Sequence, residues 1–333
     1  MTDSESPQNT QTNLEPFRNK SKITTKPAFE ERYRALLGDK YELFMEYSLS
    51  FNRRAIRVNT LKITIPELVA RLEPEWQLTP VPWAPECFWI DHKGEGDDYR
   101  RDVGNTLEHA LGYFYVQEPA SAIPPIVLDP KPNETVLDMC AAPGSKTSQI
   151  ASYMQNTGVL VANEYSGSRI AALGINLQRL GVSNAVISCA DGNRLDKSLQ
   201  FDKILVDGPC SGTGTIRKSP KTLIIWNPNM IKRLGRTQLA LLNNAYKHLK
   251  PGGTIVYSTC TLEPEENEGV VTKFLSAHPD MTVAPIELNI VRSEPILAFN
   301  GDVFDERVKD ALRIYPQDND SEGFFVCKLV KSV

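Results

Sequence analysis

An alternation of short apolar runs with helical segments constrains the fold of this 333-residue chain more than any other feature. Five runs are apolar enough to be strands buried on both faces: 135–138, 159–164, 185–190, 203–207 and 254–257. Helical segments fall between or after them, at about 168–180, at about 229–249 and from 264. Because buried strands that alternate with helices are typical of parallel sheets, the sequence predicts a mostly parallel, doubly wound α/β sheet.

The chain before this alternation has a different character. Residues 1–27 are rich in Ser, Thr, Asn, Gln and Pro, which predicts a disordered tail. Residues 28–115 combine helical spacing, an alternating strand at 55–58 and a capping box from Thr64 to Glu67. They are predicted to form a small N-terminal α/β domain, and the doubly wound domain then occupies residues 116–333.

Composition excludes several classes of protein. No apolar run approaches the roughly 20 residues that span a bilayer, and the polar N-terminus lacks the apolar core of a secretion signal. The six cysteines form no Cys-x-x-Cys pair and only four histidines are present, so neither a metal site nor a disulfide framework is predicted. We expect a cytoplasmic monomer without a membrane or metal partner. A net charge of −4 means that any surface for nucleic acid must be local.

Acidic residues and a cysteine follow the predicted strands at their carboxyl ends. In chain order they are Asp138, Glu164, Asp191, Asp207 and Cys260. Ligands of doubly wound sheets bind outside this edge. Successive acids there favour a cofactor that contains a nucleoside, with Glu164 accepting hydrogen bonds from the ribose hydroxyls and Asp191 contacting the adenine amine.

The turn after the first predicted strand, Cys140-Ala141-Ala142-Pro143-Gly144-Ser145-Lys146, is rich in small residues. Such a turn at a helix start lets backbone amides approach a polar cofactor. It is not a P-loop, because the two glycine positions, aligned on Lys146, hold Cys140 and Ser145. It is not a dinucleotide fingerprint either, because only Gly144 of the three glycines is present. A plain tight turn is the alternative to a cofactor loop.

Two cysteines lie at neighbouring predicted strand ends. Cys210 is in the glycine-rich loop after Asp207, and Cys260 follows the last of the five apolar runs. A single buried cysteine is usually a core residue. Two at the ligand-binding edge of one sheet favour a nucleophile, and the residues alone leave open which of the two it is.

Three stretches resemble the signature motifs of the Nol/Nop/Sun-type RNA (cytosine-5-)-methyltransferases: CAAPGSKT at 140–147, VDGPCSGTG at 206–214 and YSTCTLEPEENE at 257–268. Further matches bring the resemblance to roughly residues 30–330: RAIRVNTLK (54–62), VQEPASAIPP (116–125), Asp191-Gly192 and RIYPQDNDSEGFFV (313–326). Ser145 departs from the family, which commonly has glycine there. The resemblance implies a Rossmann-like methyltransferase sheet, a small RNA-binding N-terminal domain and S-adenosylmethionine as the cofactor.

The resemblance also implies the chemistry. Carbon 5 of cytosine is a poor nucleophile until a thiolate adds at carbon 6. In DNA cytosine-5 methyltransferases the Pro-Cys cysteine attacks, which would select Cys210, whereas the family resembled here implies attack by Cys260 and a role in product release for Cys210. Asp207 would bind the cytosine edge and Lys146 would lie near the base. The implied cofactor-binding residues are Cys140, Ala141, Ala142, Pro143, Gly144, Ser145, Lys146, Glu164, Arg169, Asp191 and Asp207.

RNA is expected to bind through local basic clusters. The candidates are Arg53, Arg54 and Arg57; Arg217, Lys218 and Lys221; and Lys232, Arg233 and Arg236. The compact chain shows no obvious added module at its C-terminus, which favours tRNA as the substrate, with rRNA as the alternative. The acids at 263, 265, 266 and 268 are expected to cap the last predicted helix and face solvent, leaving the cofactor sulfonium and Lys146 to stabilise a Cys260 thiolate.

Two other functions remain open from sequence. A nucleotide-binding oxidoreductase can use the same fold, although the missing glycine fingerprint argues against it. A non-catalytic RNA-binding or assembly factor can also keep the fold, and the presence of both cysteines disfavours that interpretation.

Overall fold

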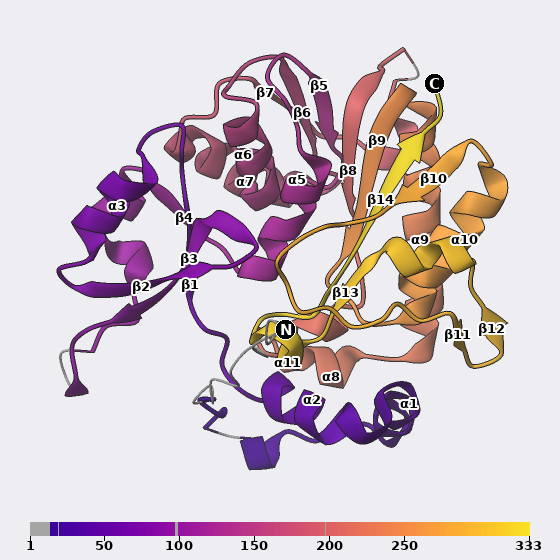
Figure 1. Cartoon of the computed structure of the whole chain (residues 1–333), viewed down its shortest axis with the longest axis horizontal. Helices are drawn as coiled ribbons and strands as arrows, with labels where there is room; N and C mark the ends of the chain where they lie inside the picture. Colours follow the sequence, from indigo (N-terminus) through magenta and orange to yellow (C-terminus); the bar gives the residue numbers. More distant parts are fainter. Residues whose placement is uncertain (1–13, 19, 97–98, 197) are drawn as a thin grey trace, which may run out of the picture.

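An eight-stranded sheet organises the computed structural model, which describes residues 14–18, 20–96, 99–196 and 198–333. The strand order is β10-β14-β9-β8-β5-β6-β7, and β13 pairs with β14 off this path (Figure 1). The strands are β5 (Thr135–Asp138), β6 (Val159–Asn163), β7 (Ala185–Ser188), β8 (Phe201–Asp207), β9 (Leu249–Thr259), β10 (Met281–Ala284), β13 (Leu312–Ile314) and β14 (Phe324–Lys331).

Strands β5 to β9 are parallel, and β14 runs antiparallel to both β9 and β10. The chain builds β5, β6 and β7 outward in one direction and then returns to place β8 on the other side of β5. The switch point of the sheet therefore lies between β5 and β8, where ligands bind in doubly wound folds. The prediction of a mostly parallel, doubly wound sheet is confirmed, and Asp138 and Asp207 end the two strands that flank the switch point.

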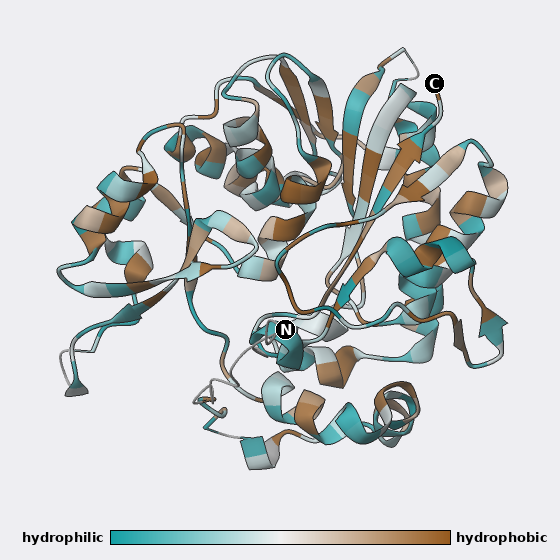
Figure 2. Ribbon diagram, in the orientation of Figure 1, coloured by the Kyte–Doolittle hydropathy of each residue, from teal (hydrophilic) through white to brown (hydrophobic). Residues whose placement is uncertain are grey.

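Successive side chains along each strand point to opposite faces of the sheet, and each face carries an apolar cluster. Helices cover both faces because both are apolar. Strand residues 136, 205 and 256 pack with α5 (Ile123–Leu128) and α6 (Ser145–Tyr153), and α7 (Gly167–Leu180) lies beside α6. Strand residues 137, 204 and 255 pack with α9 (Pro228–Lys247) and α10 (Glu268–Ala277) on the opposite face. Figure 2 shows the apolar residues gathered along the strands, with polar residues on the outer helices.

A smaller antiparallel sheet has the order β2-β3-β1-β4. Its strands are β1 (Ala55–Val58), β2 (Trp76–Val81), β3 (Ala84–His92) and β4 (Phe114–Val116). One face packs on α3 (Ile65–Leu72), which begins with the predicted capping box of Thr64 and Glu67. On the other face, Ala55 and Trp89 belong to the same apolar cluster as residues of α5. The small sheet therefore packs against the domain that contains the large sheet.

The first helices do not pack on the small sheet. Helices α1 (Pro27–Leu37) and α2 (Tyr41–Ser48) pack on α8 (Lys221–Ile225) and α11 (Pro316–Asn319), in the lower part of Figure 1. Residues 1–13 of the predicted tail lie outside the described residues. Within the described part, Phe17 N donates to Leu49 O at 3.0 Å.

The remaining elements are short. They include α4 (Leu107–Ala110), the pair β11 (Ala298–Phe299) and β12 (Asp302–Val303), and the 3-10 turns η5 (Pro119–Ala122) and η6 (Gly192–Arg194). The helix predicted from residue 264 begins as a 3-10 turn, η8 (Pro264–Glu266), and continues as α10. Among the described helices, none combines the length and the apolar character that crossing a bilayer requires.

Candidate active site

A cavity of about 350 Å³ opens at the carboxyl ends of β5, β8 and β9. Nine of the predicted site residues line it: Cys140, Ala141, Ala142, Pro143, Ser145, Lys146, Arg169, Asp207 and Cys260. Four other predicted residues, Gly144, Glu164, Asp191 and Cys210, lie outside its lining. The strand ends thus bring most of the predicted residues to one place.

Lys146 and Asp207 form an ion pair inside this cavity, with 2.8 Å between Nζ and Oδ2. Ser258 Oγ donates to the other carboxylate oxygen of Asp207 at 2.8 Å, and Lys146 Nζ donates to Ser121 Oγ at 3.0 Å. Burial acts to lower the pKa of Lys146, but the Asp207 charge outweighs it and leaves that pKa raised. The cavity therefore holds a fixed ammonium and a fixed carboxylate, which can bind a polar ligand.

The two sulfurs of Cys210 and Cys260 lie 3.1 Å apart. They meet because β8 and β9 are parallel neighbours, in which Asp207 pairs with Ser258 and each cysteine follows within three residues. The contact with Cys260 and then burial raise the pKa of Cys210 well above its usual value. Cys210 is therefore a thiol at neutral pH, held against the sulfur that faces the cavity.

The small-residue turn packs closely on its surroundings. Gly144 is the N-cap of α6 with φ +103°, a left-handed conformation that favours glycine. A Cβ at Gly144 would also lie 3.1 Å from Leu173 Cδ1. Ser145, where the resembling family commonly has glycine, is the first residue of α6 and needs no such conformation.

Glu164 and Asp191 already have partners within the chain. The buried Glu164 carboxylate accepts from Ser166 N at 2.9 Å and from Ala142 N at 3.3 Å, and it pairs with Arg169 at 3.3 Å. Asp191 accepts from Asn193 N at 3.0 Å and caps η6. Glu164 thus ties the small-residue turn to the end of β6.

Sequence reasoning missed three acids that line the cavity: Asp138 as a site residue, Glu118 and Glu322. Burial raises the pKa of Asp138 to about 7, although Thr147 Oγ1 donates to it at 2.7 Å. Glu118 accepts from Glu322 N at 2.9 Å and from Ser121 N at 3.1 Å. Glu118 lies in the motif VQEPASAIPP and Glu322 in the terminal motif that ends in SEGFFV. Both motifs were recognised from sequence, but nothing in them indicated that these glutamates line the cavity.

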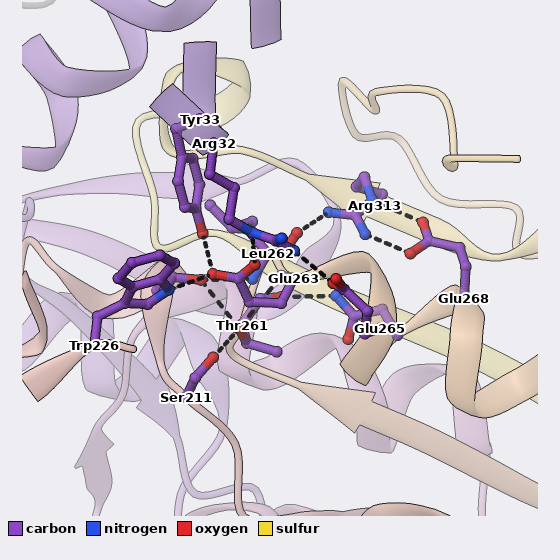
Figure 3. A network of polar contacts seen from close by, with 12 residues as sticks. Arg32, Tyr33, Ser211, Trp226, Thr261, Leu262, Glu263, Glu265, Glu268 and Arg313 are labelled. Carbon is purple, nitrogen blue, oxygen red and sulfur yellow. Dashed lines mark hydrogen bonds and ion pairs between the residues drawn. The ribbon is translucent and has the colours of Figure 1, made fainter. Parts of the chain in front are cut away.

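The expectation that the acids after Cys260 face solvent is wrong. Glu263, Glu266 and Glu268 are fully buried, and Glu265 is half-buried. Glu263 accepts from Arg32 Nε at 2.7 Å, from Tyr33 Oη at 3.0 Å and from Trp226 Nε1 at 2.7 Å (Figure 3). These donors come from α1 and from the end of α8, so Glu263 joins distant segments instead of capping a helix.

The two other buried acids also have donors from outside their own helix. Glu266 Oε2 accepts from Ser211 N at 3.0 Å and from Gln238 Nε2 at 2.8 Å. Glu268 pairs with Arg313 at 2.6 Å, and Arg313 also donates to Leu262 O at 2.9 Å (Figure 3). Together these bonds fix the backbone immediately after Cys260. They also fix the position of that backbone relative to the loop that carries Cys210.

Two of the predicted RNA-binding arginines are structural instead. Arg57 is buried and donates to Gln117 Oε1 at 2.8 Å and to Ser148 Oγ at 2.7 Å. Arg217 is buried, donates to Phe51 O at 2.7 Å and pairs with Asp320 at 2.8 Å. Five other members of the predicted clusters are exposed: Lys218, Lys221, Lys232, Arg233 and Arg236. Within the described ranges, no group of three or more His, Cys, Asp or Glu side chains could hold a metal ion.

Comparisons with known families and proteins match nearly the whole described chain. The 16S rRNA methyltransferase RsmB/F family matches residues 125–330, and the N-terminal domain of 16S rRNA methyltransferase RsmF matches residues 26–119. Ribosomal RNA small subunit methyltransferase F of Erwinia tasmaniensis is 41% identical over 319 residues, covering 93% of this chain and 64% of that protein. The tRNA (cytosine(49)-C(5))-methyltransferase of Pyrococcus abyssi is 42% identical over 305 residues, covering 90% of this chain and 94% of that protein.

Solved structures show the same fold. A methyltransferase homolog protein from Pyrococcus horikoshii is 36% identical with a TM-score of 0.83, covering 94% of this chain and 98% of that chain. NSun6 from Pyrococcus horikoshii, solved with SFG, is 25% identical with a TM-score of 0.80, covering 92% of this chain and 98% of that chain. The present chain spans about two thirds or less of the length of several ribosomal RNA relatives.

The buried ion pair generates a stability prediction. Arg313→Met should destabilise the protein by about 3–5 kcal/mol, because it leaves Glu268 as an unpaired buried charge. The double variant Arg313→Met/Glu268→Met should recover at least half of that loss, because it removes both charges. Denaturant unfolding of the three proteins measures this, and a double variant as unstable as the single one would contradict it.

Glu266 generates a pH prediction. Burial raises its pKa to about 7, above the value of about 4.3 expected in the unfolded chain. Between these values unfolding releases a proton, so this group makes the free energy of unfolding fall as pH rises from about 4 to 7. Glu266→Gln keeps an acceptor for Ser211 N and removes the titration. Its stability relative to the parent should rise over that range by up to about 3 kcal/mol.

Unfolding at pH 5 and at pH 8 measures the effect. Glu46→Gln, which changes an exposed acid of α2, is the matched control. A Glu266→Gln difference that stays the same at both pH values would contradict the assignment.

Proposed function

We propose that this chain, which belongs to the 16S rRNA methyltransferase RsmB/F family, transfers a methyl group from S-adenosylmethionine to carbon 5 of a cytosine in RNA. The observation that carries the proposal is the contact of the Cys210 and Cys260 sulfurs at 3.1 Å, in and beside a cavity that also holds the Lys146–Asp207 pair. A nucleophile, a proton donor and a charged pair for the base edge are thus gathered at the adjacent carboxyl ends of β8 and β9.

The cavity fits the cofactor. Asp138 Oδ1 is buried without a hydrogen-bond partner among the described residues, although Asp138 lines the cavity. The cofactor's ammonium group is a donor that suits this carboxylate, whose pKa of about 7 would fall beside a cation. Five residues of the turn 140–145 line the same cavity with Arg169. Glu164 accepts a hydrogen bond from Ala142 N of that turn, and we assign it and Asp191 to the nucleoside of the cofactor, as the sequence predicts. Bound there, S-adenosylmethionine supplies an electrophilic methyl group on a sulfonium.

Cys260 is the nucleophile in this mechanism. Its sulfur forms a bond to carbon 6 of cytosine, and the electrons of the C5–C6 double bond make carbon 5 nucleophilic. Lys146 and Asp207 bind the ring edge, where they neutralise the charge that develops. After carbon 5 has been methylated, its proton passes to water, and the electrons of that C–H bond form the C5–C6 double bond again. The bond between carbon 6 and sulfur breaks in the same step, and its electron pair leaves with the Cys260 sulfur.

Cys210 serves the release step. It lies off the cavity lining and its raised pKa keeps it protonated, so it is poorly suited to attack. At 3.1 Å it can share its proton with the Cys260 sulfur as that sulfur leaves carbon 6. This geometry supports Cys260 over Cys210 as the nucleophile, and the same arrangement makes an oxidoreductase or a non-catalytic factor the weaker alternatives.

The cysteine variants test this division of roles. Cys260→Ala should abolish methyl transfer, because burial raises the pKa of Cys140, the other cysteine that lines the cavity, and so disfavours its thiolate. Cys210→Ala should instead accumulate a covalent protein–RNA adduct, because addition proceeds and release does not. Transfer of labelled methyl groups and denaturing gel electrophoresis measure the two outcomes, and full turnover by Cys260→Ala would refute the mechanism.

We infer tRNA as the RNA substrate, with small-subunit rRNA as the second candidate. The tRNA methyltransferase of Pyrococcus abyssi aligns with 90% of this chain, which supports tRNA. The ribosomal relatives, at 41–45% identity, support rRNA.

Bisulfite sequencing of RNA from cells with and without the protein tests the choice. A 5-methylcytosine that disappears from a tRNA when the protein is removed, and returns with the intact gene but not with Cys260→Ala, is the expected result. Loss of a site in small-subunit rRNA alone would select the second candidate.

A further inference from the structure

A second, larger cavity adjoins the one that holds the sulfurs. It has a volume of about 710 Å³ and lies between the small sheet and the segments around 217–220 and 320–322. Five residues line both cavities: Val116, Gln117, Glu118, Lys218 and Glu322. These five residues, which we call the junction, therefore lie at the boundary of the two cavities.

The larger cavity has the chemistry of a surface for a polynucleotide strand. Five arginines line it, of which Arg217 is buried and paired with Asp320. The other four, Arg53, Arg54, Arg100 and Arg101, lie there with Phe51 and Tyr99 and with the acids Glu15 and Asp91. The Arg101 guanidinium lies 5.6 Å from the Tyr99 ring centre and 5.9 Å from that of Phe51. Arginines and aromatic rings in one groove suit phosphates and stacked bases. The ion pair of Arg101 with Glu15 is exposed, so a phosphate can replace it at little cost.

The junction is where a ribose must lie if a strand occupies the larger cavity and its target base enters the smaller one. Lys218 is exposed there and can meet a phosphate. Gln117 is occupied by Arg57, and both carboxylate oxygens of Glu118 accept backbone amides. Glu322 differs from them, because its Oε1 accepts only a long 3.4 Å bond from Asn52.

Burial and the neighbouring Glu322 raise the pKa of Glu118 to about 8. Burial also raises the pKa of Glu322, and Lys218, Lys146 and Arg217 act against that rise. Of the two carboxyl groups, Glu322 is the one with the weaker hydrogen bonding among the described residues.

We propose that the junction is the ribose site of the target nucleotide and that Glu322 accepts a hydrogen bond from its 2′-hydroxyl. This residue then selects a ribonucleotide over a deoxyribonucleotide at the methylated position, since the 2′-hydroxyl is the group that distinguishes the two. The inference rests on the proposed RNA methyltransferase activity and adds the residue that reads the sugar.

The test uses two RNA oligonucleotides that span the cytosine mapped by bisulfite sequencing. They are identical except that one carries 2′-deoxycytidine at the target position. The parent protein should methylate the deoxy substrate with a kcat/KM about ten- to a hundredfold lower, as expected when a buried carboxyl oxygen is left without its hydrogen-bond donor. Glu322→Ala should lose a similar factor on the all-ribose RNA and show no further loss on the deoxy substrate.

Two further variants keep the result interpretable. Glu322→Gln retains an oxygen acceptor and should keep part of the preference for ribose. Glu46→Ala, an exposed change on α2, should behave as the parent. Equal methylation of both substrates by the parent would overturn the inference, as would a Glu322→Ala variant that is slower but still discriminates as the parent does. Failure of the parent to methylate either RNA would instead refute the proposed function.

Discussion

The hydrogen bonds accepted by the buried carboxylate of Glu263 are the interactions on which the geometry of the site depends. This carboxylate accepts hydrogen bonds from Arg32 and Tyr33 of α1 and from Trp226 at the end of α8. Two distant segments of the chain are thereby tied to a residue only three positions after Cys260. A buried charge is costly without donors, so the first helix must dock for the segment beyond the sulfur to take its place. The position of the Cys260 sulfur therefore depends on segments far from it in the sequence and not on its own strand end alone.

The same segment shows how buried charge can specify a site. Glu263, Glu266 and Glu268 each find donors on different elements, respectively α1, α9 and β13 among others. Replacing such groups by apolar side chains would often preserve stability, but it would remove the directional bonds that fix the backbone between 261 and 268. The apolar clusters on the two sheet faces stabilise the fold as a whole. The hydrogen bonds of these acids fix the orientation of the backbone after Cys260.

Much of the fold was predictable because it follows from local patterns. Continuous apolar runs such as Ile204-Leu205-Val206 identify strands buried on both faces, and acids at their ends identify the ligand edge. The antiparallel β14 was not assigned, because the run from Phe324 gives no sign of its neighbours. The burial of Glu263 was also out of reach, since its partner Arg32 is 231 residues away. For the same reason Arg57 and Arg217 looked like surface cations. The sequence shows that a charged residue requires hydrogen-bond or ion-pair partners. Only the tertiary structure shows which residues those partners are and whether they are buried.

The place of β14 in the sheet has a consequence for how the enzyme matures. This strand lies between β9 and β10, although both precede it in the sequence. Until it inserts, the open edge of β9 is exposed, and an unpaired edge is a template for wrong pairing. The same strand brings Phe324, and the turn before it brings Glu322, to complete the cavity wall. Because β14 follows β8 and β9 in the sequence, the two strands that carry the sulfurs are synthesised before the residues that complete the cavity wall.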